Sequence, residues 1–304
     1  MVRHSPPRID LAAGLFLLGL AVVWGGSFFF AEVALREVPP LTIALHRVFW
    51  ATPLLLAVVL VRGFAIPRSP RAWLCYLVMG ALNNAIPFSL IFWGQTSIES
   101  GLASILNSMT AFFGVIVAGL LMTDERLTVN KVAGALLGVL GVAIIMGVDA
   151  LLNIDPRNLA QLAILVAALS YAFASVWGRR FLADQPPLVN AFGMLLGSAL
   201  LLIPVVLLVD GVPAVSLSTT TWASLIGIAI FSTAIAYLFY FEILARAGAA
   251  NLMLVTLLIP PVAVGLGVTV LGESMSQAAY LGYGFIALGL LVTDGRLLRI
   301  LRRK

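Results

Sequence analysis

The chain has 304 residues, of which 62% are hydrophobic and only 10% are charged, and its net charge is +5. A soluble domain carries about 25% charged residues, so this composition excludes a soluble globular protein and indicates a membrane-embedded one. The basic residues lie singly between long apolar runs, which argues against a nucleic-acid-binding surface. The single cysteine, Cys75, excludes an internal disulfide. No His, Cys, Asp and Glu spacing is typical of a metal site, and we expect no cofactor.

Apolar segments predict ten transmembrane helices, because about 20 apolar residues cross a hydrocarbon core of about 30 Å. Only a helix satisfies the backbone of such a segment in lipid. The first, Leu11–Ala31, is longer than the apolar core of a cleaved signal peptide, so we expect it to be retained. The second, Pro39–Val61, is interrupted only by His46 and Arg47. The other predicted spans are Ala72–Ile98, Ser100–Thr123, Val132–Val148, Asn158–Gly178, Gln185–Val209, Gly211–Phe241, Ala247–Gly272 and Ser274–Thr293.

The positions of Lys and Arg predict the orientation, because cytoplasmic segments of membrane proteins carry an excess of both. With the N-terminus inside, all of the 18 Lys and Arg residues except Arg36, Arg47 and Arg157 fall on inner segments or the C-terminal tail. We therefore expect a multi-pass protein of a bacterial-type inner membrane with both termini in the cytoplasm. The basic tail is expected to meet anionic lipid headgroups.

An internal repeat appears when the chain is shifted by 148 residues, which superimposes predicted helices three to five on helices eight to ten. The most informative coincidences are Gly119 with Gly267, Glu125 with Glu273, Gly134 with Gly282 and Gly141 with Gly289. Each half then holds five spans, and an odd number inverts the second half in the membrane. The predicted architecture is all-α, with repeats at 11–148 and 158–295 joined by an external linker at 149–157. Inverted repeats are typical of secondary transporters that work by alternating access.

Several motifs resemble those of a known family. They are Trp24-Gly25-Gly26-Ser27-Phe28-Phe29, the segment from Gly101-Leu102-Ala103-Ser104 to Asp124-Glu125-Arg126-Leu127-Thr128, and a second copy from Gly248-Ala249-Ala250-Asn251 through Gly272-Glu273. Over nearly its whole length the chain resembles ten-helix EamA members of the drug/metabolite transporter superfamily. The resemblance implies two EamA domains, a central cavity formed mainly by helices one, three, six and eight, and export. The aromatic and neutral amino acid exporters are the favoured branch.

Polar side chains at membrane depth are candidate site residues, because burying them in lipid is costly. Asn83 and Asn84 lie near the middle of the third span, and Ser232 is the counterpart of Asn84 in the repeat. Pro87 follows them, removes a backbone hydrogen bond, and is expected to kink the helix and free a carbonyl toward a cavity. The alternative is that Asn and Ser side chains bond neighbouring helices.

Two aromatic residues also align in the repeat, since a shift of 147 residues places Trp24 on Tyr171. Their rings would offer stacking surface to an apolar or aromatic solute, although packing between helices is the alternative. Tyr237 lies little more than one helical turn beyond Ser232 and extends this site. The predicted solute-binding set is Trp24, Asn83, Asn84, Tyr171, Ser232 and Tyr237, with Trp50 as a weaker candidate. Arg47 could attract a carboxylate, but we expect it to snorkel to headgroups.

The predicted spans contain no Asp, Glu or Lys near their middles, which disfavours exchange of protons for organic cations. Apart from Arg47, no buried cation is available to hold a phosphate. The favoured cargo is a neutral or zwitterionic solute, above all an amino acid. Proton antiport and downhill facilitation both remain open. The alternatives are an exporter of other apolar metabolites or drugs, a channel, and a membrane-embedded lipid enzyme, for which the sequence offers no nucleophile, base or metal cluster.

Overall fold

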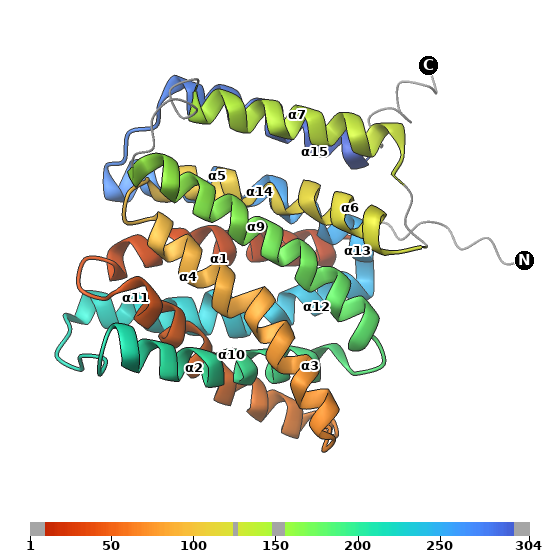
Figure 1. Ribbon diagram of the computed structural model, residues 1–304, viewed down its shortest axis with the longest axis vertical. Coiled ribbons are helices and arrows are strands. Elements are labelled where there is room, and N and C mark those ends of the chain that lie inside the picture. Colours follow the sequence, from red (N-terminus) through yellow and green to blue (C-terminus); the bar gives the residue numbers. More distant parts are fainter. Residues whose placement is uncertain (1–9, 124–126, 148–155, 295–304) are drawn as a thin grey trace, which may run out of the picture.

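The computed structural model describes residues 10–123, 127–147 and 156–294, and every regular element in these ranges is helical (Figure 1). The first half contains α1 (Leu11–Ala34), α2 (Pro40–Val61), α3 (Pro70–Gly80), η1 (Ala81–Ala85), α4 (Ile86–Gly94), α5 (Ser100–Asn107), α6 (Thr110–Leu121) and α7 (Val129–Met146). The second half contains α9 (Pro156–Phe181), α10 (Pro187–Val209), α11 (Thr219–Ala229), η2 (Ile230–Ile235), α12 (Ala236–Ala247), α13 (Ala249–Leu252), α14 (Val255–Leu266), η3 (Gly267–Leu271) and α15 (Gln277–Asp294). The η elements are π-helical turns.

The described helices match the predicted number of spans. Eight are long and apolar enough to cross a membrane, and Val255–Leu271 and Gln277–Thr293 are two shorter apolar helices. The predicted all-α membrane fold is therefore confirmed. We call the end of the bundle at which α1 begins the near end, and the end at which α1 finishes the far end.

Local sequence signals explain where the helices begin. The Asp10 carboxylate accepts a hydrogen bond from the Ala13 N–H at 2.7 Å and so caps the first turn of α1. The predicted start of the eighth span at Gly211 is wrong, because α11 begins at Thr219. Gly211 adopts a φ of 84°, which turns the chain out of α10, and the Ser218 hydroxyl caps α11.

The helix pair α7–α15 shows the inversion of the second half most directly (Figure 1, top). A Cβ on Gly141 would lie 2.6 Å from the carbonyl oxygen of Gly282. A Cβ on Gly289, the repeat counterpart of Gly141, would lie 2.6 Å from the carbonyl oxygen of Gly134. The two helices are therefore antiparallel, and their contacts exchange under the repeat, as a two-fold axis requires. Glycine at these positions lets the backbones touch.

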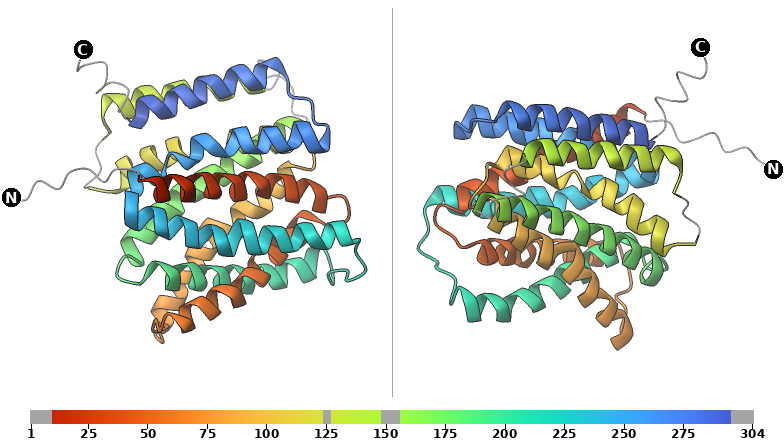
Figure 2. Two further views of the ribbon diagram at one scale, coloured as in Figure 1. Left: turned by 180° about the vertical axis from the view of Figure 1, so that it is seen from behind. Right: turned by 45° about the horizontal axis from the view of Figure 1, so that its top comes forward.

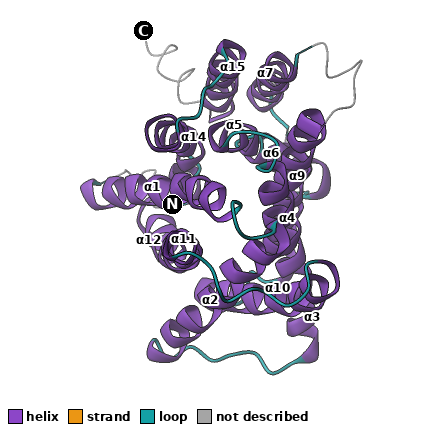
Figure 3. Cartoon of the chain, turned by 90° about the vertical axis from the view of Figure 1, so that its left-hand side faces the viewer, coloured by secondary structure: helices purple, strands orange, loops and turns teal. Residues whose placement is uncertain are grey.

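The other helices extend away from α7 and α15 in layers, as Figure 2 shows from behind and from above. α1 packs against α14 on one side and against α11 and α12 on the other, α4 packs against α9, and α2 packs against α10. Each of these contacts joins one half of the chain to the other. Figure 3 looks along the bundle from the far end and shows α1, α2, α4, α9 and α10 around its centre.

Two π-helical turns occupy equivalent places in the repeat, η1 in the third span and η2 in the eighth. η1 ends just before Pro87, so the predicted kink takes the form of a π turn. A proline at position 87 cannot donate to the carbonyl five residues earlier, that of Leu82. The Ser170 hydroxyl donates to this carbonyl at 2.7 Å, so the expected free carbonyl is taken up by a bond between helices.

Some predicted features lie outside the described residues. They are Glu125, most of the predicted linker at 149–157, and the basic tail.

Candidate functional site

Arg47 lies at the centre of the site, and the expectation that it snorkels to headgroups is wrong. Only 8% of its surface is exposed. Its Nε donates to Thr233 Oγ1 at 3.0 Å, its Nη1 to Ser27 Oγ at 2.9 Å, and its Nη2 to the Ser232 carbonyl at 3.2 Å. The Phe88 ring lies 3.8 Å from its guanidinium carbon. Arg47 thus joins α2 to α1, to α4, and to η2 of the opposite half.

The position of Arg47 along α2 explains this outcome. It lies seven residues after Pro40, about 10 Å into the helix, and its side chain reaches across to η2 and not back to the helix end. All the hydrogen-bond partners found for it are neutral. Among the described residues, no carboxylate forms a hydrogen bond or ion pair with it. An uncompensated charge in such a place costs several kcal/mol in order of magnitude.

Two of the predicted site residues lie near this cation, and a third contacts one of them. Tyr171 of α9 and Tyr237 of α12 lie within electrostatic range of the Arg47 guanidinium. The Asn83 side chain in η1 donates to Tyr237 Oη at 3.4 Å and contacts the Met194 sulfur at 3.6 Å. Asn83, Tyr171 and Tyr237 are all half-buried, so each keeps accessible surface. They come from three of the four helices that the family resemblance assigns to the cavity.

Asn84 and Ser232 lie beside this cluster but are fully buried. The Asn84 amide donates to Ser198 Oγ at 2.9 Å, and Ser198 Oγ in turn lies 3.0 Å from the Gly80 carbonyl. The Ser232 hydroxyl donates to the Val23 carbonyl at 2.5 Å. Both side chains therefore bond neighbouring helices, which matches the alternative stated for them. Only the backbone carbonyl of Ser232 reaches Arg47.

Trp24 joins the cluster through a row of rings. Its ring centroid lies 6.1 Å from that of Tyr240, which lies 5.3 Å from Phe241, and Phe241 stacks on Tyr237 at 6.1 Å. This row links α1 to α12 and gives the site an aromatic flank. Trp50 behaves differently, since it is 42% exposed.

The side chain of Trp50 contacts His46, one turn earlier in α2. Its indole N–H donates to His46 Nδ1 at 2.9 Å, and the His46 ring meets Trp222 edge-on at 5.6 Å. The structure therefore places Trp50 and His46 together, and none of the contacts found for them involves Arg47.

At the far end, two carboxylates of the second half cap helices of the first half. Asp210 Oδ2 accepts from the Thr42 N–H at 3.1 Å and from its hydroxyl at 2.8 Å, at the start of α2. Glu273 accepts from the Ser100 N–H at 2.8 Å and from the Gly101 N–H at 3.2 Å, at the start of α5. A negative charge at a helix N-terminus is stabilising. These bonds hold the two halves together at this end.

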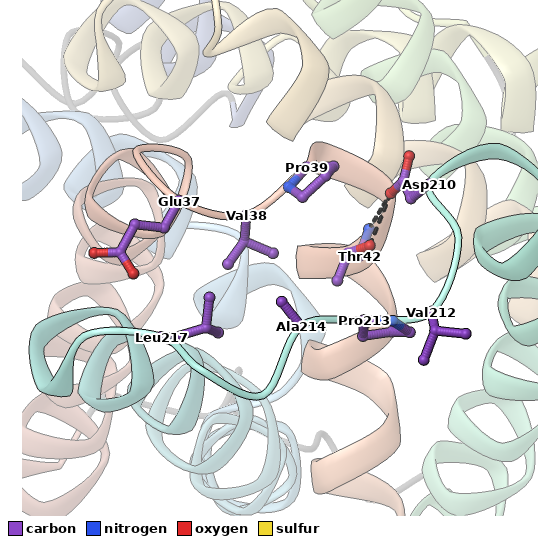
Figure 4. Close-up of a pocket in the computed structure, with 9 residues that line it drawn as sticks. All are labelled: Glu37, Val38, Pro39, Thr42, Asp210, Val212, Pro213, Ala214 and Leu217. Atoms are coloured by element: carbon purple, nitrogen blue, oxygen red, sulfur yellow. Dashed lines mark hydrogen bonds between the residues drawn. The ribbon is translucent and has the colours of Figure 1, made fainter.

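A pocket lies between the α1–α2 and α10–α11 loops at the same end (Figure 4). Asp210 and Glu37 are among its lining residues, and none of the predicted site residues is. Glu37 Oε2 accepts from the Ser218 N–H at 2.9 Å, and the hydrogen bonds from Ser218 lower the pKa of the Glu37 carboxyl below its ordinary value. We interpret this pocket as part of the junction between loops.

Sequence reasoning considered Arg47 but placed it at the headgroups, and it did not select Ser27, Thr233 or Ser198. The signal for Arg47 was available, since it lies well inside an apolar run. Ser27 stands within the Trp24-Gly25-Gly26-Ser27 motif, and Thr233 adjoins Ser232. For Ser198, nothing in the sequence distinguishes it from other small residues of its span.

Comparisons with known proteins agree with this architecture. The model of the EamA-like transporter family matches residues 11–147 and 158–293. The "Uncharacterized transporter YoaV" of Bacillus subtilis is 23% identical, over 91% of this chain and 94% of its own. The "Uncharacterized inner membrane transporter YedA" of Escherichia coli K12 is 26% identical, over 93% of this chain and 90% of its own.

One further relative and one solved structure are similar to the chain over most of its length. The "Probable amino-acid metabolite efflux pump" of Escherichia coli K12 is 28% identical, over 92% of this chain and 93% of its own. One crystal structure, of a protein 22% identical in sequence, has the same fold with a TM-score of 0.68, over 95% of this chain and 98% of its own. The match of the family model to both halves decides the assignment: the chain belongs to the EamA-like transporter family of the drug/metabolite transporter superfamily.

Proposed function

We propose that this membrane transporter exports small neutral or zwitterionic solutes, above all amino acids, by alternating access through the centre of its helix bundle. The observation that carries the proposal is the cluster of Arg47, Asn83, Tyr171 and Tyr237, to which both halves contribute. Residues at a contact between inverted halves can face either side of the membrane as the halves rock. The cluster offers one cation, an amide and two phenols, a set suited to a small polar head.

The relatives support transport and not catalysis. Several are named as transporters, and one as an amino-acid metabolite efflux pump. We therefore propose an amino acid as cargo and assign the cluster to binding alone.

The second candidate is an exporter of other apolar metabolites or drugs. The row from Trp24 through Tyr240 and Phe241 favours it, because aromatic rings bind many apolar bodies with little selectivity. A cargo of this kind needs no zwitterionic head.

The proposed setting is a bacterial-type inner membrane with both termini, and so the near end, in the cytoplasm. A membrane-impermeant thiol reagent tests this orientation in intact cells, with Cys75→Ala as the background. Thr96→Cys at the far end should react from outside, and Arg68→Cys at the near end should react only after the cells are opened. The reverse pattern contradicts the orientation.

The test of the function is uptake into proteoliposomes that contain the purified protein. The panel comprises labelled neutral, aromatic, acidic and basic amino acids, with and without a pH gradient, and protein-free liposomes are the control. Saturable uptake of neutral or aromatic members supports the proposal. Uptake of apolar drugs or metabolites with none of any amino acid supports the second candidate instead.

A further inference from the structure

We infer that Arg47 binds the carboxylate of the solute, so that a free carboxylate is the chemical feature this site requires of its cargo. The inference rests on the proposed function in that the solute enters the cluster around Arg47. It adds the residue that selects the cargo and the group that is selected.

The hydrogen bonds of the guanidinium leave donors for a ligand. Arginine has five N–H groups. The bonds to Thr233, Ser27 and the Ser232 carbonyl use one N–H on each of its three nitrogens. One N–H on each terminal nitrogen takes no part in these bonds. Guanidinium and carboxylate groups are matched in shape and bind through paired N–H groups.

The charge of Arg47 gives the second argument. A cation inside a transmembrane helix normally pairs with an anion or marks a functional site. The partners of Arg47 among the described residues are hydroxyls, a carbonyl and the face of Phe88, none of which carries a charge. A solute carboxylate would balance the cation only while bound. The charge of Arg47 then contributes to selectivity for a solute that carries a carboxylate.

A single guanidinium favours a ligand with one negative charge. Among the described residues, none of the contacts found for Arg47 is with another Lys or Arg side chain. A phosphate, which carries close to two charges, would remain partly unbalanced beside a single guanidinium. A monocarboxylate matches the site in both charge and shape.

The surrounding rings fix where the rest of the solute lies. Phe88 covers one face of the guanidinium, at 3.8 Å from its central carbon, so the ligand meets the edge of the group and not that face. Tyr171 and Tyr237 lie close enough to interact electrostatically with Arg47 and keep accessible surface. They would flank the α-carbon and side chain of an amino acid held by its carboxylate. The row through Phe241 and Tyr240 toward Trp24 suits an apolar or aromatic side chain.

The competing explanation is that Arg47 only holds helices together. Its bonds do link α2 to α1 and η2. A neutral Gln or Asn could make such links without the cost of a buried charge, which is why the charge itself calls for an anion. The test must therefore separate recognition of a carboxylate from stability.

The experiment compares three ligands that share a phenyl ring: phenylalanine, phenylalaninamide, which lacks the carboxylate, and 3-phenylpropionate, which lacks the amine. Each competes for uptake of labelled phenylalanine in proteoliposomes, and each is also scored by the rise in melting temperature of the purified protein. The variants are Arg47→Lys, Arg47→Met and, as the matched control, Arg157→Gln. Arg157 pairs with Glu99 at the far end, away from the cluster.

In the wild-type protein and in Arg157→Gln, phenylalanine should bind about 10- to 100-fold more tightly than phenylalaninamide, the range expected for a charge-assisted hydrogen bond. 3-Phenylpropionate should still stabilise both. Arg47→Met should lose this preference, and Arg47→Lys should keep part of it. If Arg47→Met does not fold, the preference for phenylalanine over phenylalaninamide is compared between the wild-type protein and Arg47→Lys, and that comparison tests the inference.

Two outcomes overturn the inference. The first is equal binding of phenylalanine and phenylalaninamide by the wild-type protein. The second is an Arg47→Met protein that is less stable but still prefers phenylalanine to its amide as strongly as the wild type does. In both cases uptake of amino acids would leave the proposed function intact. Conversely, stabilisation by 3-phenylpropionate that depends on Arg47, with no uptake of any amino acid, supports the carboxylate site and rejects the amino acid cargo.

Discussion

The glycine-lined contact between α7 and α15, here called the seam, and the cluster around Arg47 follow the internal repeat to different degrees. In the seam, Gly141 and its counterpart Gly289 face carbonyls at the same 2.6 Å, so the two halves are interchangeable there. In the cluster they are not. The residues 147 and 148 positions after Arg47 are Met194 and Leu195, both apolar and buried.

This difference separates two requirements of an alternating-access transporter. Symmetric contacts let the two halves exchange conformations at equal cost, so the seam keeps the same residues in both copies. A solute such as an amino acid has no such symmetry, and its carboxylate needs a cation on one side only. On the proposed function, the repeat builds the frame and departures from the repeat build the site.

The largest effect is expected from breaking the seam on either side. Gly141→Leu and Gly289→Leu each force a side chain against a backbone carbonyl, and overpacking of this kind costs about 1–3 kcal/mol or more. Both variants should lose most of their monodisperse protein in detergent, to a similar extent, by fluorescence-detected size exclusion. Gly284→Leu, on α15 with nothing within 4 Å of its Cβ position, should behave as wild type. Unequal damage from the first two would show that the seam is not symmetric.

Neighbouring asparagines sharpen the comparison within the cluster. Asn84→Ala removes the bond to Ser198 in a fully buried place, and we expect a loss of about 1–3 kcal/mol of stability. Asn83→Ala removes longer contacts, of 3.4 Å to Tyr237 and 3.6 Å to Met194, from a half-buried place. It should leave the melting temperature nearly unchanged and weaken uptake. If instead Asn84→Ala weakens uptake and Asn83→Ala lowers the melting temperature, Asn84 is the residue that contacts the solute.

The tyrosine hydroxyls should have smaller effects. Tyr237→Phe and Tyr171→Phe keep the rings but remove a polar group beside Arg47, and one hydrogen bond to a solute is worth about 0.5–1.5 kcal/mol. KM for the transported amino acid should rise about two- to tenfold, with the folded yield unchanged. Tyr280→Phe is the matched control, since Tyr280 is 52% exposed on α15. KM values equal to wild type would exclude these hydroxyls from the site.

The smallest effect concerns the far-end junction. The pKa of Glu37 is lowered by hydrogen bonds from Ser218, so its carboxylate stabilises the folded state above the unfolded pKa. That contribution is lost as the pH falls through the lowered folded pKa. The small difference in melting temperature between wild type and Glu37→Gln should therefore shrink as the pH falls below 4.5, the ordinary value for this group. If the difference in melting temperature between wild type and Glu37→Gln persists in acid, it arises from packing and not from the charge of Glu37.

The sequence predicted the frame better than the site, for a physical reason. Span lengths, the odd number of spans per half and the glycine matches follow from the bilayer and the repeat, so the helices and their inversion could be derived. The site depends on which way side chains point. Asn84 and Asn83 are adjacent and chemically identical, and their places on the helix surface decide that Asn84 bonds Ser198 while Asn83 contacts Tyr237. Arg47 was wrongly expected at the headgroups because its nearness to a helix end in the sequence does not reveal the Ser27 and Thr233 hydroxyls that bind it in the folded bundle.

The most direct test of the account is whether the cluster is reachable from both sides of the membrane. Asn83→Cys in the Cys75→Ala background would be exposed to a membrane-impermeant thiol reagent, in right-side-out and in inside-out vesicles. The account predicts reaction in both preparations, slowed in each by the transported amino acid. Reaction from one side only, or from neither, would contradict a transport path through the centre of the bundle.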